Sequence, residues 1–431
     1  MEFRCVENTR VDERIFFGTH ESGLKIYVIP KKEFSKSYAI YGTEYGSLHR
    51  EFIPLGDTEK VVLPDGVAHF LEHKLFEEED GTDAFNRFAE TGASANAFTS
   101  FNITAYLFTC TDRFYDNLDI LLDFVNKPYF TEKNIAKEQG IIGQEIKMYE
   151  DDPNWRVYFN ALTAMYHNNP VKIDIAGSVE SIAKITPELL YKCTDTFYNP
   201  SNMRLVCVGD VEPERVAEFV DKHIPKDRVS DEVVKFEVAE PKERVQEYIE
   251  QKLSVSSPIF NIAFKETETG VDGEELLKRE IETDILLEVL FGNSSSAYSE
   301  MYEKGIIDGS FEVDCEFEKE YGFTLIGGES KVPQEVYEKV LSVIKDAKEK
   351  GIDEKAVKRA KKLLIGDNLR KFNNVEAVGV EFIKDFMKNI NYLDYTETVE
   401  KITMEDIMNR LNVHFDTENA VLSVVKPLEE E

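Results

Sequence analysis

The sequence predicts a mixed protein of strands and helices that consists of two similar halves. Short β-rich runs alternate with longer amphipathic segments, and the same order of elements occurs twice along the chain. With 431 residues, the chain is long enough for two domains of ordinary size. We therefore expect an internal duplication of roughly 200 residues per copy.

The expected boundary between the halves lies where the composition changes. From about Asp227 to Arg244 the sequence is polar and charged and has few aromatic residues, which is typical of a linker between domains. The predicted organisation is a first domain over residues 1–226, a linker over 227–244 and a second domain over 245–431.

The composition indicates a well-cored protein that is strongly acidic. Hydrophobic residues make up 42% of the chain, charged residues make up 31%, and the formal net charge is −32. A phosphate backbone would be repelled by this charge, and the lysine-rich helical segments are interleaved with acids. We therefore expect no nucleic-acid partner.

Cysteine usage and hydropathy predict a cytoplasmic protein. The five cysteines are scattered, odd in number and without C-x-x-C spacing, which favours a reducing compartment. The N-terminal segment has no apolar core like that of a signal peptide, and no window approaches the length of a membrane span. We expect no membrane contact.

The most informative segment is Gly66–Phe76. Histidines at positions i and i+4 of a helix lie one turn apart on the same face, so His69 and His73 can direct two imidazole nitrogens at one point. Such a pair suits zinc, whose catalytic sites usually have three protein ligands and a water molecule. Glu72 lies beside this point, where a carboxylate can remove a proton from water. The order H-x-x-E-H is the zincin motif reversed.

The motif alone leaves an alternative, which is a surface helix with two solvated histidines. Apolar neighbours favour a buried helix, and buried ionisable groups need partners such as a metal ion. These neighbours are Val67, Ala68, Phe70, Leu71, Leu75 and Phe76.

The elements around this segment are also predicted from local patterns. The β-rich runs Leu24–Pro30 and Ser37–Gly42 are expected to form an antiparallel hairpin. Asp65 is the expected N-cap of the helix that carries the motif, and a second amphipathic helix is expected over Asp83–Thr91.

A run of mostly small residues over Gly92–Thr99 precedes a strand-like segment, Ile103–Cys110. Small residues leave the backbone accessible, so this edge could bind an extended peptide as an added strand. An ordinary loop and strand account for the composition equally well.

A further helix is expected from Thr131, its capping residue, to Asp151. It carries Glu138 and Glu145, which lie about two turns apart on one face. Glutamates at this spacing are usually solvated, but the helix is substantially apolar, so one carboxylate could complete a zinc site. Such a site would be assembled from two helices that are far apart in the sequence.

The second half repeats this order without a second H-x-x-E-H motif. A buried strand over Met203–Gly209 and a helix starting at Glu212 close the first half. The second half then contains four expected strands and four expected helices: Val245–Leu253, Pro258–Phe264, Glu274–Phe291, a helix opened by Gly292–Ser296 and extending through Lys304, Phe311–Phe317, Gly322–Gly327, Gln334–Lys350 and Asp353–Phe372.

Taken together, these features resemble the pitrilysin and insulinase family of zinc peptidases, which includes the mitochondrial processing peptidase. The pattern also looks like that of the bacterial YmfH-like subgroup. The resemblance covers most of the chain and is strongest at Gly66–Phe76, Asn96 with Ala97, Glu138–Pro153 and Phe197–Asp210. It implies an α+β fold with two homologous domains, each an antiparallel sheet packed with helices, that face each other across a cavity.

The same resemblance implies a zinc-dependent endopeptidase that acts on peptides or processes a small protein. His69, His73 and Glu145 would bind Zn²⁺, and Glu72 would be the general base. Glu138 would be a second acid that orients the site.

Two further assignments follow from the resemblance. Glu150 is the alternative to Glu145 as third ligand, because the spacing between the two parts of the motif varies. Asn96 and Ala97 would lie on the edge strand that holds the peptide substrate.

One departure from the family pattern bears on partners. Family members usually carry an arginine and, after a glycine, a tyrosine in the second domain, where the pair contacts substrate near the scissile bond. Here Tyr302 stands at the arginine position and Asp308 at about the tyrosine position. Donors of this kind often lower the barrier by several kcal/mol, so the chain alone would hydrolyse peptides poorly.

Two interpretations of this departure stay open. A sister subunit could supply the missing pair in a heterodimer, or the protein has moved toward a narrow processing role with different substrate contacts. We expect a homodimer or a heterodimer with a sister subunit, and Tyr302 among the substrate-binding residues. A catalytically inactive scaffold of the same fold is the alternative function, as in core subunits of respiratory complexes. The intact H-x-x-E-H motif argues against that alternative.

Overall fold

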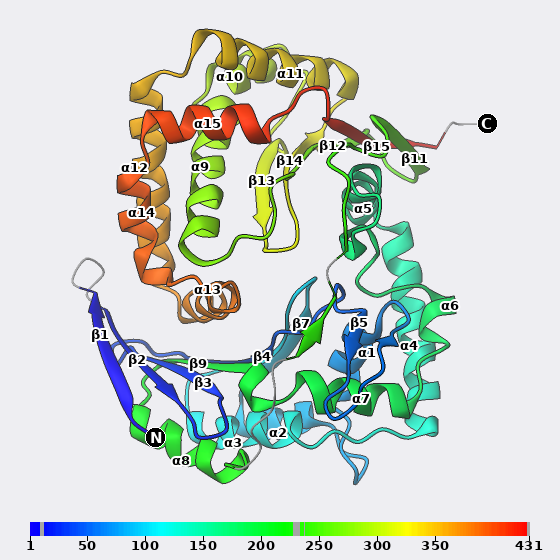
Figure 1. The fold of residues 1–431 in the computed structure, drawn as a ribbon, viewed down its shortest axis with the longest axis vertical. Helices are drawn as coiled ribbons and strands as arrows, with labels where there is room; N and C mark the ends of the chain where they lie inside the picture. Colours follow the sequence, from blue (N-terminus) through cyan, green and yellow to red (C-terminus); the bar gives the residue numbers. More distant parts are fainter. Residues whose placement is uncertain (9–12, 227–232, 237, 429–431) are drawn as a thin grey trace. The chain divides into compact units, whose positions relative to one another are not determined.

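The computed structural model describes residues 1–8, 13–226, 233–236 and 238–428. Internal contacts divide the chain into two compact units, shown in Figure 1. Unit 1 consists of Met1–Ile146, Asp174–Phe236 and Leu369–Met387, and unit 2 consists of Lys147–Ile173, Glu237–Asn368 and Lys388–Glu431. Within the described ranges, none of the helices combines the length and the apolar character needed to span a membrane.

The main sheet of unit 1 has seven strands in the order β1-β2-β3-β9-β4-β8-β7. Strands β3 and β9 are parallel, and the other neighbours are antiparallel. The strands are β1 (Phe3–Asn8), β2 (Glu13–Thr19), β3 (Lys25–Pro30), β4 (Ser37–Thr43), β7 (Ser94–Thr99), β8 (Thr104–Cys110) and β9 (Met203–Gly209). A small sheet has the order β10-β5-β6, with β10 (Val234–Lys235), β5 (Glu51–Ile53) and β6 (Val61–Val62).

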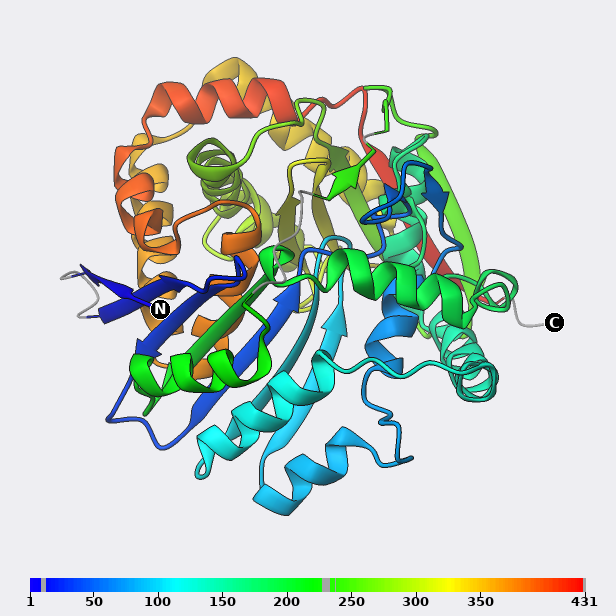
Figure 2. The same cartoon turned by 60° about the horizontal axis from the view of Figure 1, so that its bottom comes forward.

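Helices cover both faces of the seven-stranded sheet (Figures 1 and 2). Helix α3 packs on β4 and β8, and α13 packs on β4 and β9 from the other side, which explains why every residue of β4 is buried. The helices of unit 1 are α1 (Val67–Lys74), α2 (Ala84–Thr91), α3 (Phe114–Val125), most of α4 (Glu132–Asp151), α6 (Val179–Ile182), α7 (Pro187–Phe197), α8 (Pro213–His223) and α13 (Val375–Met387).

Unit 2 is built on a five-stranded sheet in the order β11-β15-β12-β14-β13. Its strands are β11 (Tyr248–Leu253), β12 (Ile259–Lys265), β13 (Glu312–Phe317), β14 (Gly322–Glu329) and β15 (Val421–Pro427). Helix α5 packs on β11, β12 and β15, whereas α9 packs on β13. The helices are α5 (Pro153–Met165), α9 (Gly273–Phe291), α10 (Ser296–Glu303), α11 (Pro333–Lys350), α12 (Glu354–Lys371, mostly in unit 2), α14 (Tyr395–Lys401) and α15 (Met404–His414).

The two sheets share one topology over five strands. In unit 1, β3 is parallel to β9, and β9, β4, β8 and β7 follow as antiparallel neighbours. In unit 2, β11 is parallel to β15, and β15, β12, β14 and β13 follow in the same way. This correspondence supports the predicted duplication, and the α+β fold class is confirmed.

The compact units differ from the predicted contiguous domains 1–226 and 245–431. Helix α5 lies in unit 2 and helix α13 lies in unit 1, so each unit includes a helix from the other half of the chain. The reason is apolar packing on the sheets, since Ile383 of α13, for example, contacts β4 at Gly42. Of the predicted linker 227–244, residues 227–232 and 237 lie outside the described residues, and Val234–Lys235 forms β10.

Two local predictions were wrong. The runs Leu24–Pro30 and Ser37–Gly42 form strands β3 and β4 but no hairpin, because β9 lies between them. Strand β9 is buried at every residue, which favours a central position with a neighbour on each side.

The N-cap of α1 is Gly66 rather than Asp65. Gly66 has φ 91°, and a Cβ there would lie 2.4 Å from the Ala176 carbonyl oxygen, so only glycine fits. Asp65 instead pairs with Arg50, with Oδ1 2.6 Å from Nε.

Candidate metal centre

Helix α1 places the two histidines on one buried face. The helix packs against β7 and β8, and Phe70 and Leu71 are fully buried in the core of unit 1. His69 is 8% exposed. The ring centroids of His69 and His73 lie 4.6 Å apart, so the predicted pairing of the two rings is present.

Helix α4 brings Glu145 to these histidines. The Nε2 atom of His69 lies 3.7 Å from Glu145 Oε1, and that of His73 lies 3.5 Å from Glu145 Oε2. One ligand atom from each of the three side chains falls within 4.8 Å of the others.

The three donors fit zinc. Bonds of 2.0–2.1 Å in a tetrahedral arrangement separate neighbouring ligand atoms by about 3.4 Å. The nitrogen–oxygen separations of 3.5 and 3.7 Å are close to this value, whereas direct hydrogen bonds would be shorter. Two imidazoles and one carboxylate are also a common ligand set of catalytic zinc sites.

The environment of the histidines favours the neutral form at His69. Burial and, to a smaller extent, the neighbouring His73 lower the pKa of His69 to about 4 against the opposing charges of Glu145 and Glu138, so the ring is neutral at physiological pH and can bind a metal. Burial also lowers the pKa of His73, but its hydrogen bond with Glu138 and the charges of the nearby glutamates outweigh burial and raise it. A bound dication would offset these carboxylates and favour neutral imidazole.

Glu72 lies on α1 beside the metal-ligand cluster and contacts strand β7. The hydroxyl of Thr99 donates a hydrogen bond of 2.7 Å to Glu72 Oε2. Burial raises the pKa of Glu72, although the Thr99 hydrogen bond and His73 act in the opposite direction. A carboxylate with a raised pKa is a better proton acceptor, which suits a general base.

Glu138 lies behind His73 rather than at the metal position. The Nδ1 atom of His73 is 3.3 Å from Glu138 Oε1, and the Nζ atom of Lys74 is 3.6 Å from Glu138 Oε2. Burial alone would raise the pKa of Glu138, but the contacts with His73 and Lys74 lower it. Glu138 thus stays ionised and can accept a hydrogen bond from the Nδ1–H group of His73.

The remaining predicted residues lie in different places. Glu150 is exposed and is not part of the cluster that Glu145 completes. Asn96 and Ala97 lie on β7, which is an edge strand of the seven-stranded sheet, and the Asn96 side chain is exposed. Tyr302 lies on α10 in unit 2, is 54% exposed and stacks on Tyr298.

Sequence reasoning missed Thr99 and Lys74. Thr99 follows the Asn96-Ala97 pair on the same strand, and its contact with Glu72 depends on the packing of β7 against α1. Lys74 is a lysine inside an apolar segment, with an acid three residues later at Glu77. That pattern could have identified Lys74 as a paired residue, because a buried lysine needs a partner of opposite charge.

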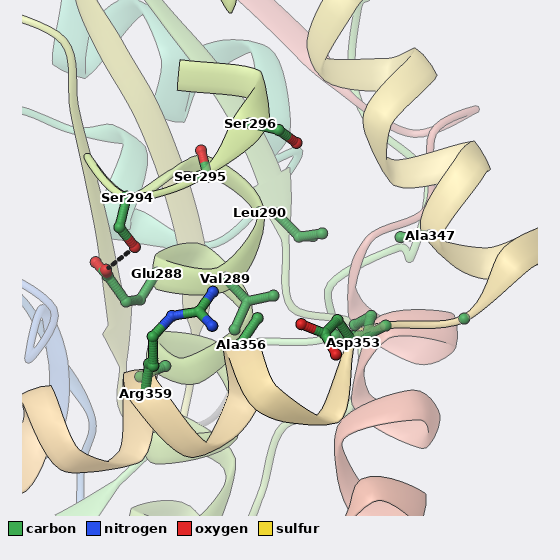
Figure 3. A pocket seen from close by; sticks show the side chains of 13 residues that line it. Glu288, Val289, Leu290, Ser294, Ser295, Ser296, Ala347, Asp353, Ala356 and Arg359 are labelled. Carbon is green, nitrogen blue, oxygen red and sulfur yellow. Dashed lines mark hydrogen bonds between the residues drawn. The ribbon is translucent and has the colours of Figure 1, made fainter. Parts of the chain in front are cut away.

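Unit 2 contains a separate cavity of about 370 Å³ between α9, the start of α10 and the helices α11 and α12 (Figure 3). Its wall includes Arg359 and Glu288, and Ser294 donates a hydrogen bond of 3.5 Å to the Glu288 carboxylate. None of the predicted site residues lines this cavity.

Two family models match consecutive parts of the chain. Residues 55–179 match the model described as Insulinase (Peptidase family M16), and residues 184–364 match the Peptidase M16 inactive domain. The first segment includes the whole candidate metal centre.

Similar proteins span the full length. The protein named "Uncharacterized zinc protease YmfH" from Bacillus subtilis is 43% identical over 424 residues, which are 98% of this chain and 99% of the relative. The crystal structure of an M16-like peptidase from Alicyclobacillus acidocaldarius superposes with a TM-score of 0.92 at 33% identity and covers 99% of each chain. Pitrilysin has the same fold, with a TM-score of 0.77 at 16% identity over 99% of this chain and 47% of its own. The motifs, the duplicated sheets and the full-length similarity agree that this chain belongs to the M16 family of peptidases.

Proposed function

We propose that this protein is a zinc-dependent endopeptidase whose metal is bound by His69, His73 and Glu145. The observation that carries the proposal is the meeting of these three donors beside the carboxylate of Glu72. The names of the relatives, which are zinc proteases, support the choice of metal.

The chemistry is assigned to residues of unit 1. A bound zinc ion supplies positive charge that acidifies water and polarises a peptide carbonyl. The Glu72 carboxylate accepts a proton from the attacking water and returns it to the leaving amine, while the water oxygen bonds to the carbonyl carbon and the C–N bond breaks. Thr99 holds Glu72 for this transfer through its hydrogen bond.

The substrate is proposed to be an extended peptide on strand β7. The edge position of β7 leaves one side of the strand for backbone pairing, and Asn96 and Ala97 lie in its middle. Thr99 connects the same strand to Glu72, so peptide binding and proton transfer would occur at neighbouring positions. Free cysteines favour a reducing compartment, and we place this activity in the cytoplasm.

The test combines metal content with peptide hydrolysis. The wild-type chain is expected to bind one zinc ion, and His73→Ala is expected to lose it. Glu72→Gln should keep the zinc and lose hydrolysis by about 100-fold or more, because a general base contributes roughly that much. Glu79→Gln is the matched control, since Glu79 is exposed and lies on the segment that follows α1.

Two results would reject parts of this proposal. Full hydrolysis by Glu72→Gln would remove Glu72 from the mechanism. Metal-free wild-type protein that folds normally would favour the inactive scaffold of the same fold.

We further propose that a sister subunit completes the site. Tyr302 and Asp308 occupy the positions where the family carries its arginine and tyrosine, so the transition-state donors would come from another chain. Cleavage of a peptide library by this protein should rise at least tenfold when a relative that has the pair but lacks H-x-x-E-H is added. Equal cleavage with and without that relative would favour a chain that acts alone or as a homodimer.

A further inference from the structure

Lys74 is a fully buried lysine next to the metal ligand His73. Its side chain is 0% exposed, and its Nζ atom lies 2.6 Å from Glu77 Oε2 and 3.6 Å from Glu138 Oε2. Burying an ammonium group is costly unless it is paired with an opposite charge. Glu77 and Glu138 supply that charge for Lys74.

Glu138 is held between Lys74 and His73. Oε1 of Glu138 faces His73 Nδ1 at 3.3 Å, and Oε2 faces Lys74 at 3.6 Å. The two contacts use both oxygens and therefore fix the plane and the position of the carboxylate. A contact to Oε1 alone would leave the carboxylate free to rotate about it.

The orientation of His73 depends on this carboxylate. When Nδ1–H donates to Glu138, the lone pair of the ring is on Nε2, which is the atom 3.5 Å from Glu145. Partners of this kind hold both the tautomer and the ring direction of a metal-ligating histidine. Lys74 also places a positive charge between two carboxylates, those of Glu77 and Glu138.

We propose that Lys74 is a positioning residue that acts through Glu138 to orient His73 for zinc binding. This inference rests on the proposed zinc peptidase function. The competing explanation is purely structural, because the pair between Lys74 and Glu77 three residues later could by itself stabilise the end of α1.

A double-mutant cycle on zinc affinity separates the two roles. The full chain is stripped of metal, and its zinc affinity is measured by competition with a chromophoric chelator. Lys74→Met and Glu138→Gln should each weaken zinc binding by about 10–100-fold, the usual effect of losing such a partner. If Lys74 acts through Glu138, the double variant should bind zinc about as tightly as the single variant that has the lower zinc affinity.

The controls distinguish a specific loss of zinc affinity from misfolding and from a general effect of removing a lysine. Lys137→Met is the matched control, because Lys137 is mostly exposed and contacts Glu77 at 3.7 Å but is not paired with Glu138. It should retain wild-type affinity. If Lys74→Met does not fold, Lys74→Gln replaces it, since glutamine keeps a hydrogen-bond donor and removes the charge, and a loss of at least tenfold is expected.

The inference would be overturned if the Lys74 variant bound zinc as tightly as wild type. It would also be overturned if the fold loss of zinc affinity in the double variant equalled the product of the two single losses. The proposed function would still stand if the wild-type chain binds one zinc ion that His73→Ala removes. A wild-type chain that binds no zinc would overturn both.

Discussion

Thr99 is the residue that connects the expected substrate strand to the expected general base. Its hydroxyl donates to Glu72 at 2.7 Å, and a hydrogen bond to a charged group contributes roughly 1.5–3 kcal/mol. Thr99→Val keeps the shape of the side chain and removes this donor. We expect kcat to fall about tenfold or more, with KM and zinc content nearly unchanged.

Steady-state kinetics on a fluorogenic peptide would measure this effect. Thr99→Ser restores the hydroxyl and should recover most of kcat, which a general packing defect would not show. A Thr99→Val enzyme with wild-type kcat would mean that Glu72 is positioned by other contacts.

At the scale of elements, helix α9 carries a buried acid, and we expect it to make the stability of the protein depend on pH. Glu282 is 6% exposed, and burial raises its pKa from 4.5 to about 7, opposed by Lys278 and assisted by Asp406. Arg410, which also opposes the rise, lies with Asp406 on α15, and α15 packs against α9.

The sign of the effect follows from proton binding. Between pH 4.5 and 7, folded Glu282 keeps a proton that the unfolded chain releases, so the free energy of unfolding falls as pH rises. Glu282→Gln removes this dependence and should be more stable than wild type at pH 8 by about 1–3 kcal/mol. At pH 4.5 the two proteins should have nearly equal stability.

Denaturant unfolding at pH 4.5 and pH 8 would test this expectation. Glu274→Gln serves as the control, because Glu274 is exposed in the first turn of the same helix. Parallel pH profiles for Glu282→Gln and wild type would contradict the assignment.

Strand β7 makes a second element-scale prediction, about the substrate. If the peptide is bound as an added strand, its backbone N–H groups contribute to affinity. N-methylation at alternate residues of a cleaved peptide should raise KM about tenfold or more when the modified groups face β7, and should have little effect at the intervening positions. Equal effects at all positions would argue against strand addition.

At the scale of the whole molecule, each unit requires a helix from the other half of the sequence. In unit 1, α13 covers β4 and β9, and its Gly379 lies so close to Tyr38 that a Cβ would be 2.4 Å from the ring. A fragment of residues 1–236 lacks α13 and should expose this apolar face. We expect it to aggregate or to unfold without a cooperative transition, as measured by size-exclusion chromatography and circular dichroism.

A peptide of residues 369–387 offers a direct control, since it supplies α13 in trans. It should increase the soluble fraction of the fragment and restore a cooperative transition. A fragment that folds fully without the peptide would show that α13 is dispensable for unit 1.

Local patterns predicted most residues of the candidate metal-ligand cluster. The spacing of His69, Glu72 and His73 depends only on helix geometry, so it can be read from five consecutive residues. The sequence favoured Glu145 over Glu150 because Glu145 lies seven residues after Glu138, and Glu145 is the one that lies in the cluster with the two histidines. Thr99 and Lys74 were missed because their roles arise from contacts between separate elements.

The same distinction explains where the observed packing differs from local expectations. The runs that became β3 and β4 were recognised, but their separation by β9 depends on a pairing between residues that are distant in the sequence. A contiguous domain boundary was expected because it is the simplest interpretation of composition, which does not show that α5 and α13 pack in the other unit. Each of these helices packs in the other unit because an apolar sheet face lies there, and that face forms only when distant strands pair.

The long sequence separation between α13 and the strands that it covers also has a consequence for biosynthesis. Chains are made from the N-terminus, and domains generally begin to fold as they leave the ribosome. Unit 1, which holds the metal cluster, cannot bury its sheet until Val375–Met387 has emerged. Unit 1 therefore stays incomplete until residues 375–387 have been made, and the proposed peptidase activity cannot begin before that point.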